Sequence, residues 1–162
     1  MLPSVKNILY ASDLGEGSRP AFRHAVKMAN LYGAKLTFLH TLEQVSDGAK
    51  GVLQNVIDRE TLEQLEREGA ERMINKIKER IEKFIFDEID DPSQRPPSVE
   101  AVVEQGTPWR TITDTADKMN ADMIVMGVRT HSTLQHMLLG STSQKVISHS
   151  MIPVLVVPLP PR

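Results

Sequence analysis

Residues 5–42, VKNILYASDLGEGSRPAFRHAVKMANLYGAKLTFLHTL, read as a strand, a helix and a second strand in succession. The short apolar run at the start ends in DLGEG, a pattern typical of a buried strand that leads into a loop. Ser18 and Pro20 favour the start of a helix, which Gly33 ends, and residues 35–42 return as an apolar strand. A unit of about 35 residues fits a right-handed crossover between parallel strands. This stretch therefore predicts an α/β fold.

The rest of the chain continues the alternation. Further strands are predicted at residues 99–105, 123–126 and 153–157, and further helices at residues 59–86, 107–119 (capped by Thr107) and 141–149. Residues 43–57 and 90–97 are interpreted as loops. The strands are apolar on both faces, which favours a parallel sheet covered by helices on both sides. We therefore expect residues 1–162 to form a single domain with a doubly wound, five-stranded parallel sheet.

The helix predicted at residues 59–86 is long and amphipathic. Its apolar positions follow helical spacing, and Glu, Lys and Arg fill the opposite face. The expected buried stripe consists of Leu62, Leu65, Met73, Ile74, Ile77, Ile81, Phe84 and Ile85. The charged face is interpreted as a solvated surface.

Composition narrows the function classes. The chain of 162 residues contains no cysteine, which excludes disulfides, thiolate catalysis and cysteine-ligated zinc. A net charge of −2 leaves no basic excess for nucleic-acid phosphates, so no nucleic-acid partner is expected. There is no apolar run of the roughly 18 residues that would span a membrane, and no secretion signal at the start, so we expect a cytoplasmic protein with no membrane partner.

Two loops have the composition of a binding site. In open α/β sheets, ligands bind beyond the carboxyl ends of the strands, where the strand order reverses. The first predicted strand ends at Asp13, followed by Gly15 and Gly17. The fourth is followed by GVRT at residues 127–130 and then by GSTS at residues 140–143, where exposed N–H groups and three hydroxyls at a helix start favour phosphate. The same residues also suit an ordinary turn and a helix cap.

The spacing of these residues resembles the universal stress protein family. Its ATP-binding members carry Gly, two residues, Gly, nine residues, and then Gly-Ser or Gly-Thr; here Gly127, Gly140 and Ser141 match, while Thr130 replaces the second glycine. The resemblance extends over nearly the whole chain, through Asp13 with Ser18 and Ala21, LHT at residues 39–41, GTP at residues 106–108 and PVLVV at residues 153–157. It implies a Rossmann-like, adenine nucleotide alpha hydrolase-like fold.

The resemblance also implies a ligand and its contacts. The ligand would be ATP or AMP, bound by a protein that acts in a stress response. Asp13 would lie near the ribose and the main chain of Thr41 near the adenine. Gly127 and Arg129 would follow the ribose and phosphates, with Thr130 beside them, and Gly140, Ser141, Thr142 and Ser143 would surround the terminal phosphates. A magnesium ion carried by the nucleotide could be held by Asp13 and Ser141. A β-branched residue at position 130 resists the backbone conformations that glycine allows, which favours the alternative of an interaction module that has lost nucleotide binding.

Other catalytic constellations are absent from the sequence. There is no Walker A string, and Pro20 stands where a dinucleotide fingerprint needs its third glycine. The five histidines show no metal-ligand spacing, and Ser141 lies in no Gly-x-Ser-x-Gly elbow. No catalytic base is identified, so any ATP hydrolysis should be slow. An enzyme that acts on an adenylated or phosphorylated small molecule ranks last.

The last predicted strand suggests an assembly. It is short, strongly apolar and expected at a sheet edge, where unpaired backbone groups favour another strand. We expect a homodimer formed by antiparallel pairing through Val154, Leu155, Val156 and Val157, and the family resemblance agrees.

Overall fold

The computed structural model of the protein describes residues 1–15, 17–44, 58–129 and 139–160. The strands are β1 (Asn7–Ser12), β2 (Lys35–Leu42), β3 (Ser98–Gln105), β4 (Met123–Arg129) and β5 (Val154–Leu159). The helices are α1 (Arg19–Tyr32), α3 (Arg59–Glu88), α4 (Pro108–Lys118) and α5 (Ser141–His149), with a short 3-10 helix at Pro92–Gln94. The predicted alternation of strands and helices is confirmed.

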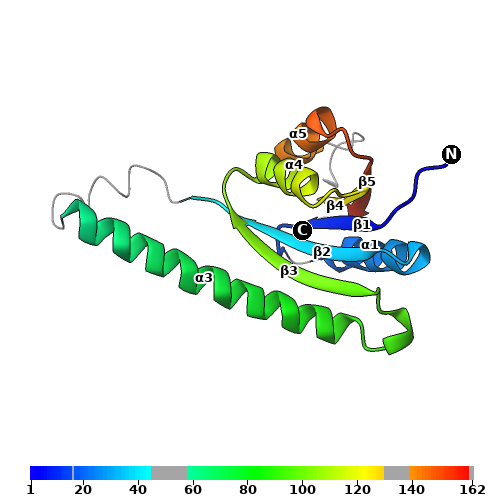
Figure 1. The fold of residues 1–162 in the computed structure, drawn as a ribbon, viewed down its shortest axis with the longest axis horizontal. Coiled ribbons are helices and arrows are strands. Elements are labelled where there is room, and N and C mark those ends of the chain that lie inside the picture. Colours follow the sequence, from blue (N-terminus) through cyan, green and yellow to red (C-terminus); the bar gives the residue numbers. More distant parts are fainter. Residues whose placement is uncertain (16, 45–57, 130–138, 161–162) are drawn as a thin grey trace.

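The strands form one parallel sheet in the order β3-β2-β1-β4-β5. Helices α1 and α3 share a buried cluster with one face of the sheet, and α4 and α5 share another with the opposite face. Figure 1 shows these two helical layers on either side of the strands. The predicted fold class, a doubly wound five-stranded sheet with helices on both faces, is therefore confirmed.

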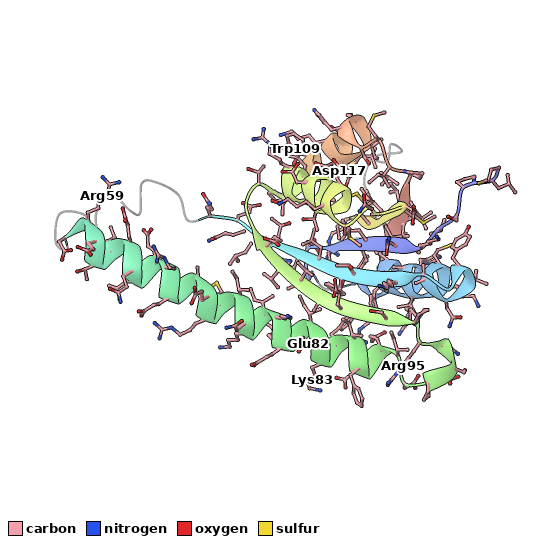
Figure 2. All side chains as sticks on the ribbon, in the orientation of Figure 1. Arg59, Glu82, Lys83, Arg95, Trp109 and Asp117 are labelled. Carbon is pink, nitrogen blue, oxygen red and sulfur yellow. The ribbon has the colours of Figure 1, made fainter. Side chains whose placement is uncertain are left out.

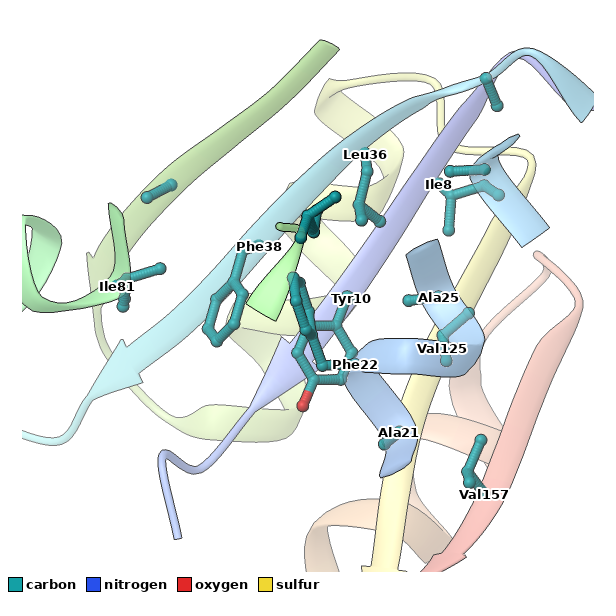
Figure 3. Packing of buried hydrophobic residues seen from close by; sticks show 14 of the residues in the cluster. Ile8, Tyr10, Ala21, Phe22, Ala25, Leu36, Phe38, Ile81, Val125 and Val157 are labelled. Atoms are coloured by element: carbon teal, nitrogen blue, oxygen red, sulfur yellow. The ribbon is translucent and has the colours of Figure 1, made fainter. Parts of the chain in front are cut away.

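An aromatic cluster fills the face covered by α1 and α3. The Tyr10 ring lies edge-on to Phe38, with centroids 4.8 Å apart, and Phe22 from α1 packs against both. Phe84 brings α3 into the cluster, with its ring centroid 5.1 Å from that of Phe22. Figure 3 shows Tyr10, Phe22 and Phe38 together, with Ile81 of α3 beside them. Each fully buried large side chain of this kind contributes about 1.5–3 kcal/mol to stability.

The face covered by α4 and α5 is aliphatic. Leu9 of β1 and Ile124 of β4 are fully buried there, and they pack with Ile112 of α4 and Val146 of α5. The packing fixes the starts of both helices at the carboxyl edge of the sheet, because helices in parallel α/β units run back along the strands.

Helix α3 packs against the sheet mainly through its second half. Ile81 is buried and Phe84 half-buried, but Leu65 and Met73 are 49% and 53% exposed. The expectation that Leu65 and Met73 belong to the buried stripe is therefore wrong. In Figure 1 the N-terminal half of α3 extends beyond the strands. The apolar periodicity of the helix therefore continues past the end of the sheet surface against which α3 packs.

The remaining surface of α3 is charged, as expected. Ion pairs between residues four apart line it, for example Arg59 with Glu63 and Lys83 with Asp87. Near its C-terminal end, Glu88 pairs with Arg19 and Arg23 of α1, both at 3.1 Å. Among the helices of the described residues, none is long and apolar enough to cross a membrane.

Candidate functional site

The strand order reverses between β1 and β4. The candidate binding loops were predicted to follow these two strands because ligands bind at such a reversal. β1 lies in the middle of the sheet, and its connection leads to β2 on one side while β4 and β5 lie on the other. The carboxyl ends of β1 and β4 therefore lie side by side at the edge of the sheet where doubly wound folds bind their ligands.

The loop after β1 is a hydrogen-bonded turn built around Asp13. The Gly15 N–H donates to Asp13 Oδ1 at 2.8 Å, and the Leu14 N–H donates to Ser12 Oγ at 3.1 Å. Leu14 has a φ of +58°, a left-handed conformation that is costly for a leucine. Such strain concentrates at functional sites. The turn holds the Asp13 carboxylate at the mouth of the sheet, with its side chain 60% exposed.

Arg129, the last residue of β4, lies beside Asp13. Its Nη2 is 3.8 Å from Asp13 Oδ2, which makes an ion pair but is too long for a hydrogen bond. The guanidinium side chain is only 17% exposed, and Nε and Nη2 are buried without a hydrogen-bond acceptor. Buried donors of this kind are rare in native proteins. The structure thus brings together two predicted site residues, and leaves donor atoms that an added oxygen would satisfy.

Gly127 has a packing role in β4. A Cβ at this position would lie 2.5 Å from Leu159 Cδ1 on β5, so the glycine lets Leu159 approach the strand closely. The sequence reasoning placed Gly127 along a nucleotide and did not anticipate this contact.

Thr41 occupies the carboxyl end of β2, opposite Glu104 of β3. Its side chain is half-buried, and its Oγ1 is buried without a hydrogen-bond partner. Thr130, the residue that replaces a motif glycine, lies outside the described residues.

Helix α5 begins at the same edge of the sheet. Its N-cap residue, Gly140, has no side chain with which to cap the helix, and no acidic residue lies in the first turn. Ser141 is exposed and Thr142 half-buried, whereas Ser143 is only 6% exposed and packs into the interior. Of the three predicted hydroxyls, those of Ser141 and Thr142 are therefore the accessible ones.

A cavity of about 520 Å³ adjoins the start of α5. Three segments line it: the residues after β2, the β3–α4 turn, and the first turns of α5. The lining residues are Glu43, Gln44, Gly106, Thr107, Pro108, Trp109, Ser141, Thr142 and Lys145. Of these residues, the sequence indicated only Ser141 and Thr142 as candidate site residues. The Gly-Thr-Pro sequence at residues 106–108 was the one feature of the β3–α4 turn that could have indicated a site there.

The β3–α4 turn has its own geometry. Gly106 has a φ of +154°, and a Cβ there would lie 2.7 Å from Thr111 Oγ1, so this wall of the cavity needs glycine. Thr107 occupies the N-cap position of α4, but its side chain forms no cap hydrogen bond, so the expected side-chain cap is not formed.

Trp109, the chain's only tryptophan, forms a fixed wall of the cavity. Its ring packs against His149 of α5, with centroids 4.6 Å apart, and the Arg110 guanidinium lies 5.2 Å from the ring centroid. Figure 2 labels Trp109 on α4, beside α5. The described residues contain no group of three or more His, Asp or Glu side chains placed to hold a metal ion.

Comparison with known proteins identifies the family. Residues 4–158 match the model of the universal stress protein family, and the chain belongs to this family. The universal stress protein MJ0577 of Methanocaldococcus jannaschii is 26% identical over 156 residues, 94% of each chain. The solved structure of MJ0577 has a TM-score of 0.70, with 96% of this chain and 97% of that one covered.

Two further solved structures contain ligands. One is a universal stress protein in complex with cAMP, 19% identical, with a TM-score of 0.60 and coverage of 96% of this chain and 98% of that one. The other is the Archaeoglobus fulgidus universal stress protein in complex with dAMP, 21% identical, with a TM-score of 0.54 and coverage of 93% and 96%. Both likenesses establish the shared fold.

Proposed function

We propose that this protein binds an adenine nucleotide, ATP or AMP, at the carboxyl edge of the sheet, and that occupancy changes its surface or its dimer for a partner in a stress response. The observation that carries the proposal is the cavity of about 520 Å³ at the start of α5, on the edge where Asp13 and Arg129 meet. The cAMP and dAMP complexes of two family members support an adenine nucleotide as the ligand.

The residues fit such a ligand chemically. The Asp13 carboxylate accepts hydrogen bonds from ribose hydroxyls, and the main chain of Thr41 serves the base. The buried Nε and Nη2 of Arg129 supply donors for ligand oxygens. Gly127 lies within β4, and Thr130 follows Arg129 in the sequence.

The start of α5 suits phosphate. Gly140 at the N-cap offers no side-chain acceptor to the N–H groups of the first turn, which Gly140, Ser141, Thr142 and Ser143 present. A magnesium ion that arrives with ATP would be held mainly by phosphate oxygens and water, with Asp13 and Ser141 as the protein ligands.

Calorimetric titration of nucleotide-free protein with Mg-ATP and then AMP tests the proposal. We expect micromolar binding that Ser141→Ala weakens about tenfold, because a hydrogen bond to a charged group is lost. Ser148→Ala, an exposed serine farther along α5, is the matched control and should bind as wild type does. Absence of binding to either nucleotide would refute the proposal.

One alternative has a specific feature in its favour. Thr130 stands where ATP-binding members have glycine, which suits an interaction module of the same fold that has lost the nucleotide. A Thr130→Gly variant distinguishes the two. If wild type fails to bind while Thr130→Gly binds, the interaction module is the correct description.

The proposed dimer pairs β5 with its copy across the exposed edge. β5 is the last strand of the sheet, next to β4 alone among the described strands. Light scattering that gives the mass of one chain across micromolar concentrations would contradict the dimer.

A further inference from the structure

The cavity between α4 and α5 is lined by two charged side chains that form no ion pair with another described residue. Lys145 lines it from α5, and Glu43 lines it from the segment after β2. A cavity lined by groups of opposite charge on two separate segments favours a ligand that is itself asymmetric in charge.

Lys145 lies near the N-terminal, positive end of α5, where the helix dipole does not stabilise a cation. Side chains in a helix lean toward its N-terminus, so the Lys145 ammonium is carried back over the turn of Ser141 and Thr142. The start of a helix is its positive end, and here no acidic residue in the first turn offsets it. The Lys145 side chain is exposed, so water solvates its ammonium in the free protein, and an anion bound at the start of α5 would gain a charge-assisted contact from it.

The other walls suit the neutral part of the same ligand. Trp109 presents an indole held in place by its contacts with His149 and Arg110. Gln44, beside Glu43, offers an amide that can both donate and accept hydrogen bonds. The negative charge of Glu43 disfavours phosphate beside it, whereas the ammonium of Lys145 favours phosphate.

We propose that Lys145 makes this cavity selective for the number of negative charges on the bound nucleotide, with the base toward Trp109 and Gln44. The inference rests on the proposed nucleotide binding and assigns its specificity to one residue. ATP, which carries more negative charge than AMP, gains most from the ammonium, and adenosine gains nothing.

The test compares ATP, AMP and adenosine on wild type, Lys145→Gln and Lys145→Arg. Binding is followed by calorimetry and by the fluorescence of Trp109, which reports the cavity directly because the chain has no other tryptophan. We expect Lys145→Gln to weaken ATP about tenfold, AMP about threefold and adenosine not at all, as loss of a charge-assisted contact requires. Lys145→Arg keeps the charge and should keep the order of preference.

Lys118→Gln is the matched control. It removes the same charge from the far end of α4 and does not line the cavity, so all three affinities should be unchanged. Equal weakening of all three ligands by Lys145→Gln, or no weakening of ATP, would overturn the role of Lys145 while nucleotide binding stands. If wild type binds none of the three, both the proposed function and this inference fail.

Discussion

At the scale of single residues, Gly127 meets a packing requirement at a position for which a binding role is proposed. We expect Gly127→Ala to lower the free energy of unfolding by about 1 kcal/mol, because the buried side chain of Leu159 must shift to admit the new methyl group. Denaturant unfolding measures the change. In a Leu159→Ala background the same substitution should cost much less, and an equal cost in both backgrounds would show that this contact is not the cause.

Tyr10 provides a prediction about pH. Burial raises the pKa of its phenol above the ordinary value of 10.0, and the nearby Asp13 carboxylate raises it further, while hydrogen bonds with Ser12 and Ser18 act in the opposite direction. A group with a raised pKa in the folded state contributes stability that is present below pH 10 and is lost as the pH rises through the folded value.

We therefore expect alkaline unfolding to be coupled to ionisation of Tyr10. The absorbance of tyrosinate against pH, measured for wild type and for Tyr10→Phe, isolates the Tyr10 titration as the difference between the two curves. That difference should appear above pH 10 and coincide with loss of the circular dichroism signal. A Tyr10 titration complete below pH 10 in the folded protein would contradict the prediction.

At the scale of elements, α3 depends on few contacts for its position. Phe84 is half-buried and joins the aromatic cluster of Phe22 and Phe38, whereas Phe86 on the same helix is 68% exposed. We expect Phe84→Ala to reduce the free energy of unfolding by about 2 kcal/mol, less than the cost at a fully buried site.

Phe86→Ala is the control for this prediction, because it deletes the same ring from an exposed position of α3. Its cost should be a few tenths of a kcal/mol, since it loses mainly the contact with Arg95. Chemical unfolding of both variants gives the comparison, and equal costs would show that the aromatic cluster does not hold α3.

The strands and helices were predictable because their signals are local. Apolar runs bounded by glycine and polar residues located each strand, although β4 and β5 each continue two or more residues past the predicted ends at Met126 and Val157. Glycine and proline commonly end strands, so Gly127 and Pro158 favoured ends for β4 and β5 that were too early. Both residues nevertheless fit within a strand, Gly127 because it makes room for a neighbouring side chain and Pro158 because it lies in an edge strand. Periodicity also placed Leu65 on the apolar face of α3, but it gives no information about what covers that face.

The site was only partly predictable from the sequence. Asp13 was expected because it follows a strand at the reversal of strand order, and Arg129 because the family resemblance implied it. The pairing of β1 with β4 brings the two residues close enough for their ion pair. Trp109, Lys145 and Glu43 come together from three segments, through the way α4 and α5 cross the sheet. The spacing of these residues in the sequence does not indicate that the three segments come together.

At the scale of the whole molecule, the outer edge of β5 determines how two copies could pair. The Ile124 N–H donates to the Pro153 carbonyl, so alternation along the strand turns the N–H groups of Val154 and Val156 away from β4. The next outward position is Pro158, which has no N–H to offer. Pairing of β5 with a second copy should therefore use Val154 to Val157 and stop at the proline.

Val156→Pro tests this geometry, because it removes one outward N–H and leaves the hydrogen bonds to β4 in place. We expect the variant to remain folded by circular dichroism and to shift from dimer to monomer in light scattering at micromolar concentration. Val156→Thr is the matched control, because it keeps both the backbone N–H and the β-branched shape. This variant should remain a dimer. A dimeric Val156→Pro would place the interface elsewhere.

The end of β5 also reaches the binding loops. Leu159 fills the space beside Gly127, and Pro160 and Arg129 both lie 3.6 Å from where a Cβ of Gly17 would be. β5 thus carries the proposed dimer edge in Val154 to Val157 and continues past Pro158 to residues beside the proposed ligand loops. Any free energy that couples dimer and ligand must act equally in both directions. If bound nucleotide raises the affinity of one chain for another, the dimer must bind nucleotide more tightly than the monomer by the same overall factor. Dilution to the monomer would then lower nucleotide affinity, so that nucleotide occupancy would depend on the concentration of the protein as well as on that of the nucleotide.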